Sequence, residues 1–177
     1  FNRRFDPNFK HVKEVVDAGD IGAPHILRIT SRDPGPPPVS YIKVSGGLFF
    51  DMTIHDFDMA RYLCGEVVRV HAFAGCRVDP EIEEAGDIDT AVVTLRTASG
   101  KRCTINNSRR ATYGYDQRIA VHGADGMLRA ANKLEHLVEV AGRDGFTTAP
   151  NKHFFLERYG DAFGAEMISF IPAINVV

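Results

Sequence analysis

The second half of the chain changes from helical to strand periodicity, and this change limits the possible folds more than any other feature. Between residues 67 and 149, short β-rich runs alternate with the turn sequences "ASGK", "GADG" and "GRDG". Such runs between glycine turns are typical of antiparallel strands joined by tight connections. The sequence therefore predicts an antiparallel meander built from residues 67–78, 87–98, 101–111, 118–132 and 136–149.

The first part of the chain predicts a helix and a strand. In "DPNFKHVKEVVDAGDIG", Asp6 stands at a helix N-cap, Pro7 at the first helical position and Gly19 near the stop. Residues 24–33 alternate in polarity as a strand does. The "PGPPP" sequence at 34–38 joins neither a ladder nor a helix, so it predicts a loop.

Helical spacing returns at His153 and ends the chain. The sequence "HFFLERYGDAFGAEMISFI" offers one broad apolar stripe, made of Phe154, Leu156, Tyr159, Phe163, Met167 and Phe170. Together, these patterns predict a single α+β domain over residues 1–177. Its sheet is expected to be open and predominantly antiparallel, with helices packed on one face.

Composition excludes several classes of function. The net charge of −2 gives no electrostatic reason for binding nucleic acid or an anionic membrane. No run approaches the roughly 20 apolar residues of a membrane span, and the first residues lack the apolar run of a signal peptide. Three widely spaced cysteines without a C-x-x-C predict reduced thiols. These observations predict a cytoplasmic protein.

One segment, "GGLFFDMTIHDFDMARYL" at 46–63, concentrates acidic residues around a histidine. A helix that begins near residue 50 or 51 places Asp51, His55, Asp58 and Tyr62 at i, i+4, i+7 and i+11, on one stripe. Histidine exchanges protons near neutral pH, and a carboxylate one turn away can orient the ring. The segment therefore predicts an acid/base site presented by a helix.

Two other interpretations fit the same spacing. In a purely structural one, Asp51 caps the helix, His55 makes a buried hydrogen bond, and Asp56 and Asp58 are solvated. In the other, His55 and Asp58 bind a divalent metal, as in a metal-dependent hydrolase or isomerase. The cluster contains one histidine and no second ligand motif, so we expect no metal site.

The segment resembles the G-G-x-x-x-D-x-x-x-H-x-x-D sequence of the glucose-fructose oxidoreductase, inositol dehydrogenase and rhizopine-catabolism (Gfo/Idh/MocA) family. Three further stretches resemble successive blocks of the family's C-terminal domain: "FNRRFDPNF", "ATYGYDQRIAVHGADG" and "FLERYGDAFGAEMISFI". These blocks follow in order and cover nearly the whole chain.

The resemblance implies roles for individual residues. It makes His55 the general acid/base, Asp51 its catalytic carboxylate partner and Asp58 a group that binds a substrate hydroxyl. The weaker candidates for substrate contact are Thr53, Tyr113 and Tyr115, with half-buried packing on a strand as the alternative for both tyrosines. Asn106, Asn107 and Arg109 equally suit polar positions at a sheet edge, and we predict no site role for them.

The resemblance also implies an activity and a cofactor. Such enzymes oxidise a secondary alcohol of a cyclic polyol or sugar, here best matched by myo-inositol, with NAD or NADP. The dinucleotide-binding G-x-G-x-x-G and the family's Glu-Lys-Pro are absent from this sequence. We therefore expect a fragment of a longer two-domain enzyme, with the cofactor bound mainly by the missing domain and little activity in this chain alone.

The alternative is a non-catalytic domain that associates through its sheet. An exposed sheet face bearing Val92, Leu95 and Ile105 would need covering, and the resemblance places subunit contacts on that face. Either interpretation predicts a homodimer or homotetramer.

Overall fold

The computed structural model describes residues 1–174. Its strands are β1 (Pro24–Arg32), β2 (Val67–Gly75), β3 (Thr90–Thr97), β4 (Arg102–Ser108), β5 (Asp116–Gly123), β6 (Met127–Ala130), β7 (Glu139–Gly142) and β8 (Gly145–Thr148). Its helices are α1 (Pro7–Ala18), α2 (Val39–Ser45), α3 (Ile54–Cys64), α4 (Pro80–Glu84), α5 (Phe155–Arg158) and α6 (Gly160–Ile174). A 3₁₀ turn covers Asn2–Phe5, and a π-helical turn covers Phe49–Thr53.

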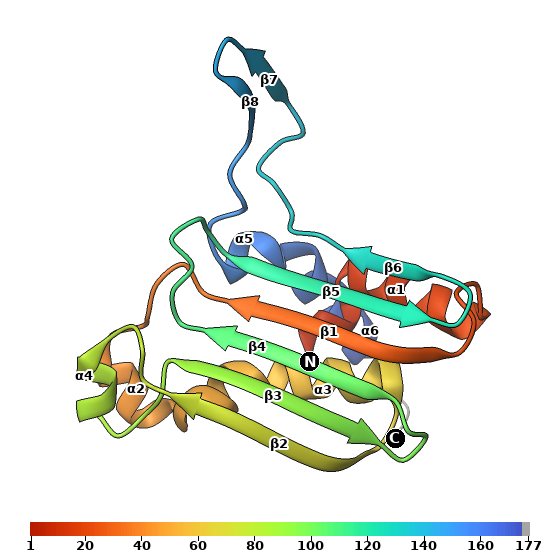
Figure 1. Cartoon of the computed structure of the whole chain (residues 1–177), viewed down its shortest axis with the longest axis horizontal. Helices are drawn as coiled ribbons and strands as arrows, with labels where there is room; N and C mark the ends of the chain where they lie inside the picture. The colour runs from red at the N-terminus through yellow and green to blue at the C-terminus, as the bar shows by residue number, and fades with distance from the viewer. Residues whose placement is uncertain (175–177) are drawn as a thin grey trace.

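The main sheet has six strands in the order β2-β3-β4-β1-β5-β6 (Figure 1). Neighbours are antiparallel except β1 and β4, which are parallel. The predicted meander is therefore confirmed for β2–β4 and for the β5–β6 hairpin, but it is wrong elsewhere. Strand β1 lies between β4 and β5, and β7 pairs only with β8. Periodicity identifies strands, whereas their neighbours depend on how buried faces meet in three dimensions.

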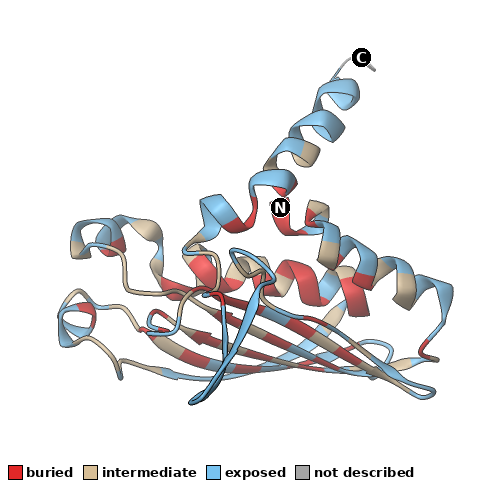
Figure 2. Ribbon diagram, turned by 90° about the horizontal axis from the view of Figure 1, so that it is seen from above, coloured by how far each residue is buried: buried red, intermediate tan, exposed pale blue. Residues whose placement is uncertain are grey.

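The core lies between one face of the sheet and the helices α1 and α3 (Figure 2). The predicted α+β class, with helices on one face of a mostly antiparallel sheet, is confirmed. The expectation for Leu95 and Ile105 is wrong, because alternation along their strands turns both toward the helices, where they are 3% and 0% exposed. Val92 points to the open face and is 43% exposed.

The N-terminal helix forms as predicted. The Asp6 carboxylate accepts hydrogen bonds from the backbone N–H groups of Asn8 and Phe9, both at 3.1 Å, and so caps α1. Gly19 ends the helix in the left-handed conformation, at φ 81°. The short helices α2 and α4 were not predicted, since neither is long enough to show a helical period.

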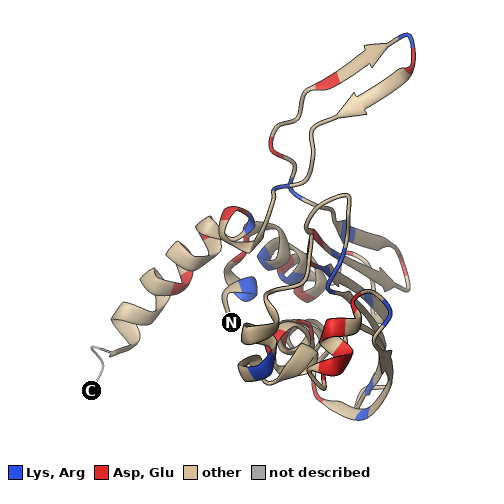
Figure 3. Ribbon diagram, turned by 90° about the vertical axis from the view of Figure 1, so that its left-hand side faces the viewer, with Lys and Arg blue, Asp and Glu red and all other residues tan. Residues whose placement is uncertain are grey.

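The predicted final helix is divided in two at Tyr159, whose backbone leaves helical geometry. Tyr159 turns into the core and is 2% exposed, while Leu156, Met167 and Phe170 are at least half exposed. The prediction of one broad apolar stripe packed against the rest of the domain is therefore wrong. Helix α6 and the β7–β8 hairpin both extend away from the body, and α6 carries few charged side chains (Figure 3). None of the helices in residues 1–174 is long and apolar enough to cross a membrane.

Candidate active site

The acidic segment begins with a pair of glycines. Gly46 ends α2 with φ 85°, and Gly47 follows with φ 83°, a region that glycine enters without strain. The π-helical turn comes next and runs directly into α3. The helix was expected to begin near residue 50 or 51, which falls inside this turn. A π turn widens the helix and is common at functional sites, and here it carries Asp51.

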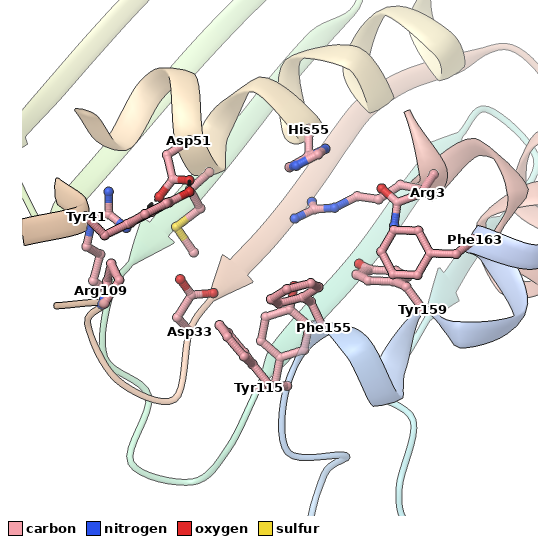
Figure 4. Close-up of a pocket in the computed structure, with 14 residues that line it drawn as sticks. Arg3, Asp33, Tyr41, Asp51, His55, Arg109, Tyr115, Phe155, Tyr159 and Phe163 are labelled. Atoms are coloured by element: carbon pink, nitrogen blue, oxygen red, sulfur yellow. Dashed lines mark hydrogen bonds and ion pairs between the residues drawn. The ribbon is translucent and has the colours of Figure 1, made fainter. Parts of the chain in front are cut away.

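A cavity of about 550 Å³ lies beside this turn, a size typical of small-molecule sites (Figure 4). The 3₁₀ turn, the loop after β1, the start of α3 and the α5–α6 region surround it. Its lining combines charged and aromatic side chains: Asn2, Arg3, Asp33, Pro37, Tyr41, Asp51, Met52, His55, Arg109, Tyr115, Phe154, Phe155, Tyr159 and Phe163.

His55 supplies the imidazole of the cavity. Burial and the positive charge of Arg3 lower the pKa of His55 to about 4, against the opposing effect of the Asp51 and Asp58 carboxylates. The ring is therefore neutral at pH 7 and able to accept a proton. Its Nδ1 is buried without a hydrogen-bond partner in the part of the chain that is described. A buried polar atom without a partner is unusual in a folded protein and is a feature of reactive sites.

Asp51 lies at one end of the cavity and is held by two donors. The Tyr41 hydroxyl donates to Oδ1 at 2.7 Å, and Arg109 Nη1 donates to Oδ2 at 3.0 Å. Within residues 1–174, no hydrogen bond joins Asp51 to His55. The carboxylate therefore acts on the imidazole through its charge.

Arg3 is buried at the centre of the cavity wall. It forms an ion pair with Asp56, and its Nη2 donates to Ser31 Oγ at 3.2 Å. Asp56 also accepts from Asn107 Nδ2 at 2.7 Å. Both charges are compensated inside the fold, as buried charges need to be. Arg3 thus adds a fixed positive charge beside His55.

Asp33 directly follows β1 and lines the cavity across from Asp51 and His55 (Figure 4). Burial raises the pKa of Asp33 to about 6, although the positive charges of Arg109 and Arg3 oppose the rise. Nothing described in residues 1–174 donates a hydrogen bond to its carboxylate. An ionised carboxylate in this position is a ready acceptor for ligand hydroxyl groups.

The six predicted site residues separate into two groups. Asp51, His55 and Tyr115 line the cavity, and Tyr115 packs edge to face against Phe154 and Tyr159. The other three are engaged elsewhere. Thr53 is fully buried and donates to Asn107 at 2.8 Å, Asp58 forms a two-bond ion pair with Arg4, and the Tyr113 hydroxyl donates to Asp116 at 2.6 Å.

The predicted stripe of Asp51, His55, Asp58 and Tyr62 is therefore divided. The first two residues face the cavity, whereas Arg4 pairs with Asp58 and lies over the Tyr62 ring at 4.9 Å. The division falls inside α3, between His55 and Asp58, so it follows from the ion pair of Asp58 with Arg4 and not from the π turn that precedes the helix.

Sequence reasoning missed several polar side chains of the cavity, among them Asn2, Arg3, Asp33, Tyr41 and Arg109. By sequence, Arg109 equally suits a sheet edge and has no predicted site role, yet it is 0% exposed and lines the cavity. For Asp33 and Arg109 the available signal was position in the chain. Each directly follows a strand, where functional loop residues are common. Arg3 and Tyr41 offered no comparable signal.

The described residues contain no group of three or more histidine, cysteine, aspartate or glutamate side chains placed to hold a metal ion. In the pair considered for a metal, His55 and Asp58, both carboxylate oxygens of Asp58 accept hydrogen bonds from Arg4.

Several known proteins are similar to this chain in both sequence and fold. Myo-inositol 2-dehydrogenase from Thermotoga maritima is 58% identical over 99% of this chain and 53% of its own length. A crystal structure of a myo-inositol dehydrogenase from Corynebacterium glutamicum superposes with a TM-score of 0.95 at 43% identity, over 99% of this chain and 53% of that one.

A crystal structure of scyllo-inositol dehydrogenase from Lactobacillus casei, with bound NAD(H) and scyllo-inositol, has a TM-score of 0.87 and 33% identity. The match covers 98% of this chain and 53% of that one. The chain thus spans about half the length of the relatives that it matches. A family model for the GFO/IDH/MocA C-terminal domain matches residues 9–129. The chain therefore belongs to the GFO/IDH/MocA family, as its C-terminal domain.

Proposed function

We propose that this chain is the substrate-binding and catalytic domain of an NAD(P)-dependent dehydrogenase. The substrate is a cyclic polyol or sugar with a secondary alcohol, and the relatives favour myo-inositol. The observation that carries the proposal is the neutral imidazole of His55, which lines the cavity with an unpartnered Nδ1. A neutral imidazole beside a polar cavity is suited to removing a hydroxyl proton.

The chain's own residues account for the proton step. As hydride leaves the carbinol carbon, the hydroxyl becomes acidic and passes its proton to His55. The carboxylate of Asp51 favours the positive charge that develops on the ring, and Arg3 disfavours it. These opposing charges let the ring take the proton during turnover and release it afterwards.

The cavity also provides contacts for a polyol. Asp33 and the Tyr41–Asp51 pair offer acceptors for hydroxyl groups, while Tyr115 forms part of an aromatic wall. We propose that these residues orient the substrate. The substrate contacts of Thr53, Asp58 and Tyr113 stay predictions. In this structure, each of these side chains is bound to another residue of the fold.

We expect the main dinucleotide site to lie outside this chain. Helices α1 and α4 begin with the carboxylate caps Asp6 and Asp79, which would repel a pyrophosphate, and the sequence has no G-x-G-x-x-G. We propose that the rest of the complete protein binds NAD or NADP, which accepts the hydride. We further predict a cytoplasmic location, which cell fractionation checks.

The test uses the complete gene product, assayed with NAD and with NADP against myo-inositol, scyllo-inositol and glucose. His55→Ala should lower kcat by about 10²- to 10⁴-fold, the usual contribution of general acid/base catalysis. His25→Ala is the matched control, because His25 is exposed on β1 and outside the cavity. Near-normal turnover by His55→Ala would remove the assignment, and turnover of another polyol would change only the substrate.

We also propose that copies of the chain associate through the open face of the sheet. Phe73 and Val92 form a cross-strand pair on this face and are 71% and 43% exposed. Association would remove this apolar surface from water. Light scattering coupled to size-exclusion chromatography should report a dimer or tetramer. A monomer at micromolar concentration would contradict the proposal.

A further inference from the structure

Arg109 is the most deeply buried charged side chain that lines the cavity. It follows β4, is 0% exposed and lies with Tyr41 and Asp51 at one end of the cavity (Figure 4). Its guanidinium donates from Nη1 to Asp51 at 3.0 Å and from Nη2 to Asp87 at 3.4 Å. One cation therefore bridges two carboxylates that come from different parts of the chain.

The second carboxylate, Asp87, holds the beginning of the segment that carries Asp51. Its Oδ1 accepts a hydrogen bond from the backbone N–H of Leu48 at 3.0 Å. It also packs against Gly47, where a Cβ would lie 2.8 Å from the same oxygen. Arg109 is thus connected to the π-helical turn at two points, its start through Asp87 and its centre through Asp51.

These contacts fix the direction of the Asp51 carboxylate. Arg109 holds Oδ2 and Tyr41 holds Oδ1, so neither oxygen is free to rotate toward His55. The negative charge is nevertheless kept one turn away from the imidazole. Such preorganised charge is effective because nothing needs to reorient during the reaction.

We infer that Arg109 is a positioning residue for the proposed dehydrogenation, acting through Asp51 and through the Asp87 contact with the π-helical turn. This inference rests on the proposed function. Arg109 contributes by holding the catalytic carboxylate at a fixed distance and direction from His55. Its loss should therefore lower kcat more than it changes the KM for the polyol.

The experiment compares Arg109→Lys and Arg109→Ala in the complete protein. Arg109→Lys keeps the charge but loses the planar fork that reaches both carboxylates. Misplacement of a catalytic group by about 1 Å can cost about 10²-fold. We therefore expect kcat to fall about 10- to 100-fold in Arg109→Lys and further in Arg109→Ala, with a smaller change in the KM for the polyol. Arg110→Ala is the control, since the neighbouring Arg110 is exposed.

Chemical rescue separates positioning from a purely structural role. Guanidinium at millimolar concentration should restore part of the kcat of Arg109→Ala, because the lost group lines an open cavity. Urea has a similar shape without the charge and should not restore it. Unchanged kcat in folded Arg109→Lys, or a loss in Arg109→Ala that guanidinium does not rescue, would overturn the inference. Near-normal turnover by His55→Ala would instead contradict the proposed function.

Discussion

Replacement of Asp33 by asparagine should make the protein more stable at neutral pH. Asp33 is a largely buried carboxylate, and burial raises its pKa from 3.8 to about 6. A raised carboxyl pKa means that the folded state favours the protonated form. The associated stability is present below pH 3.8 and is lost as the pH rises through about 6. Asparagine has nearly the same shape and carries no charge.

The shift sets the size of the effect. A rise in pKa of about 2, at about 1.4 kcal/mol for each tenfold change in proton affinity, corresponds to about 3 kcal/mol at pH 7.5. At pH 4.5, Asp33 is largely deprotonated in the unfolded chain and protonated in the folded protein. The free-energy cost of Asp33 relative to asparagine is then about 1 kcal/mol. The stability advantage of Asp33→Asn should therefore decrease by about 2 kcal/mol between these two pH values.

Urea denaturation of wild type and variant at pH 7.5 and 4.5 measures this difference. Asp144→Asn is the control, since Asp144 is exposed in the β7–β8 turn and its replacement should change stability by less than about 0.5 kcal/mol. A variant that is equally stable, or whose advantage does not depend on pH, would refute the reasoning. The unfavourable charge at Asp33 also supports a role in binding, because such costs are typical of functional sites.

Two further predictions concern the segment that carries His55. In an NMR titration, the His55 imidazole should stay neutral until the pH falls to about 4, because burial and Arg3 disfavour its charged form; a transition near pH 6.5 would contradict this. Gly47→Ala should destabilise the protein by about 1–3 kcal/mol, since Gly47 has φ 83° and an added Cβ would meet Asp87 at 2.8 Å. Gly19 has nearly the same φ, but an added Cβ there would meet nothing within 4 Å, so Gly19→Ala is the control for backbone strain alone. In thermal unfolding, Gly47→Ala should therefore destabilise the protein more than Gly19→Ala does.

Local sequence predicted the elements whose formation depends on neighbours in the chain. The Asp6 cap with Pro7 and Gly19 defined α1, because capping and left-handed termination act within one turn. Alternating polarity and glycine turns located most strands, and the spacing of Asp51 and His55 placed both on the side that faces the cavity. These features determined the α+β class and brought Asp51 and His55 to the same cavity as candidates for acid/base chemistry.

Tertiary structure alone decided which distant residues meet. No local pattern places β1 between β4 and β5, and none brings Arg109 from the end of β4 to Asp51. The same holds for Asp58, which binds Arg4 from the start of the chain. Sequence periodicity describes the face on which a side chain lies, but its partner is set by packing of whole layers and by the need to compensate every buried charge.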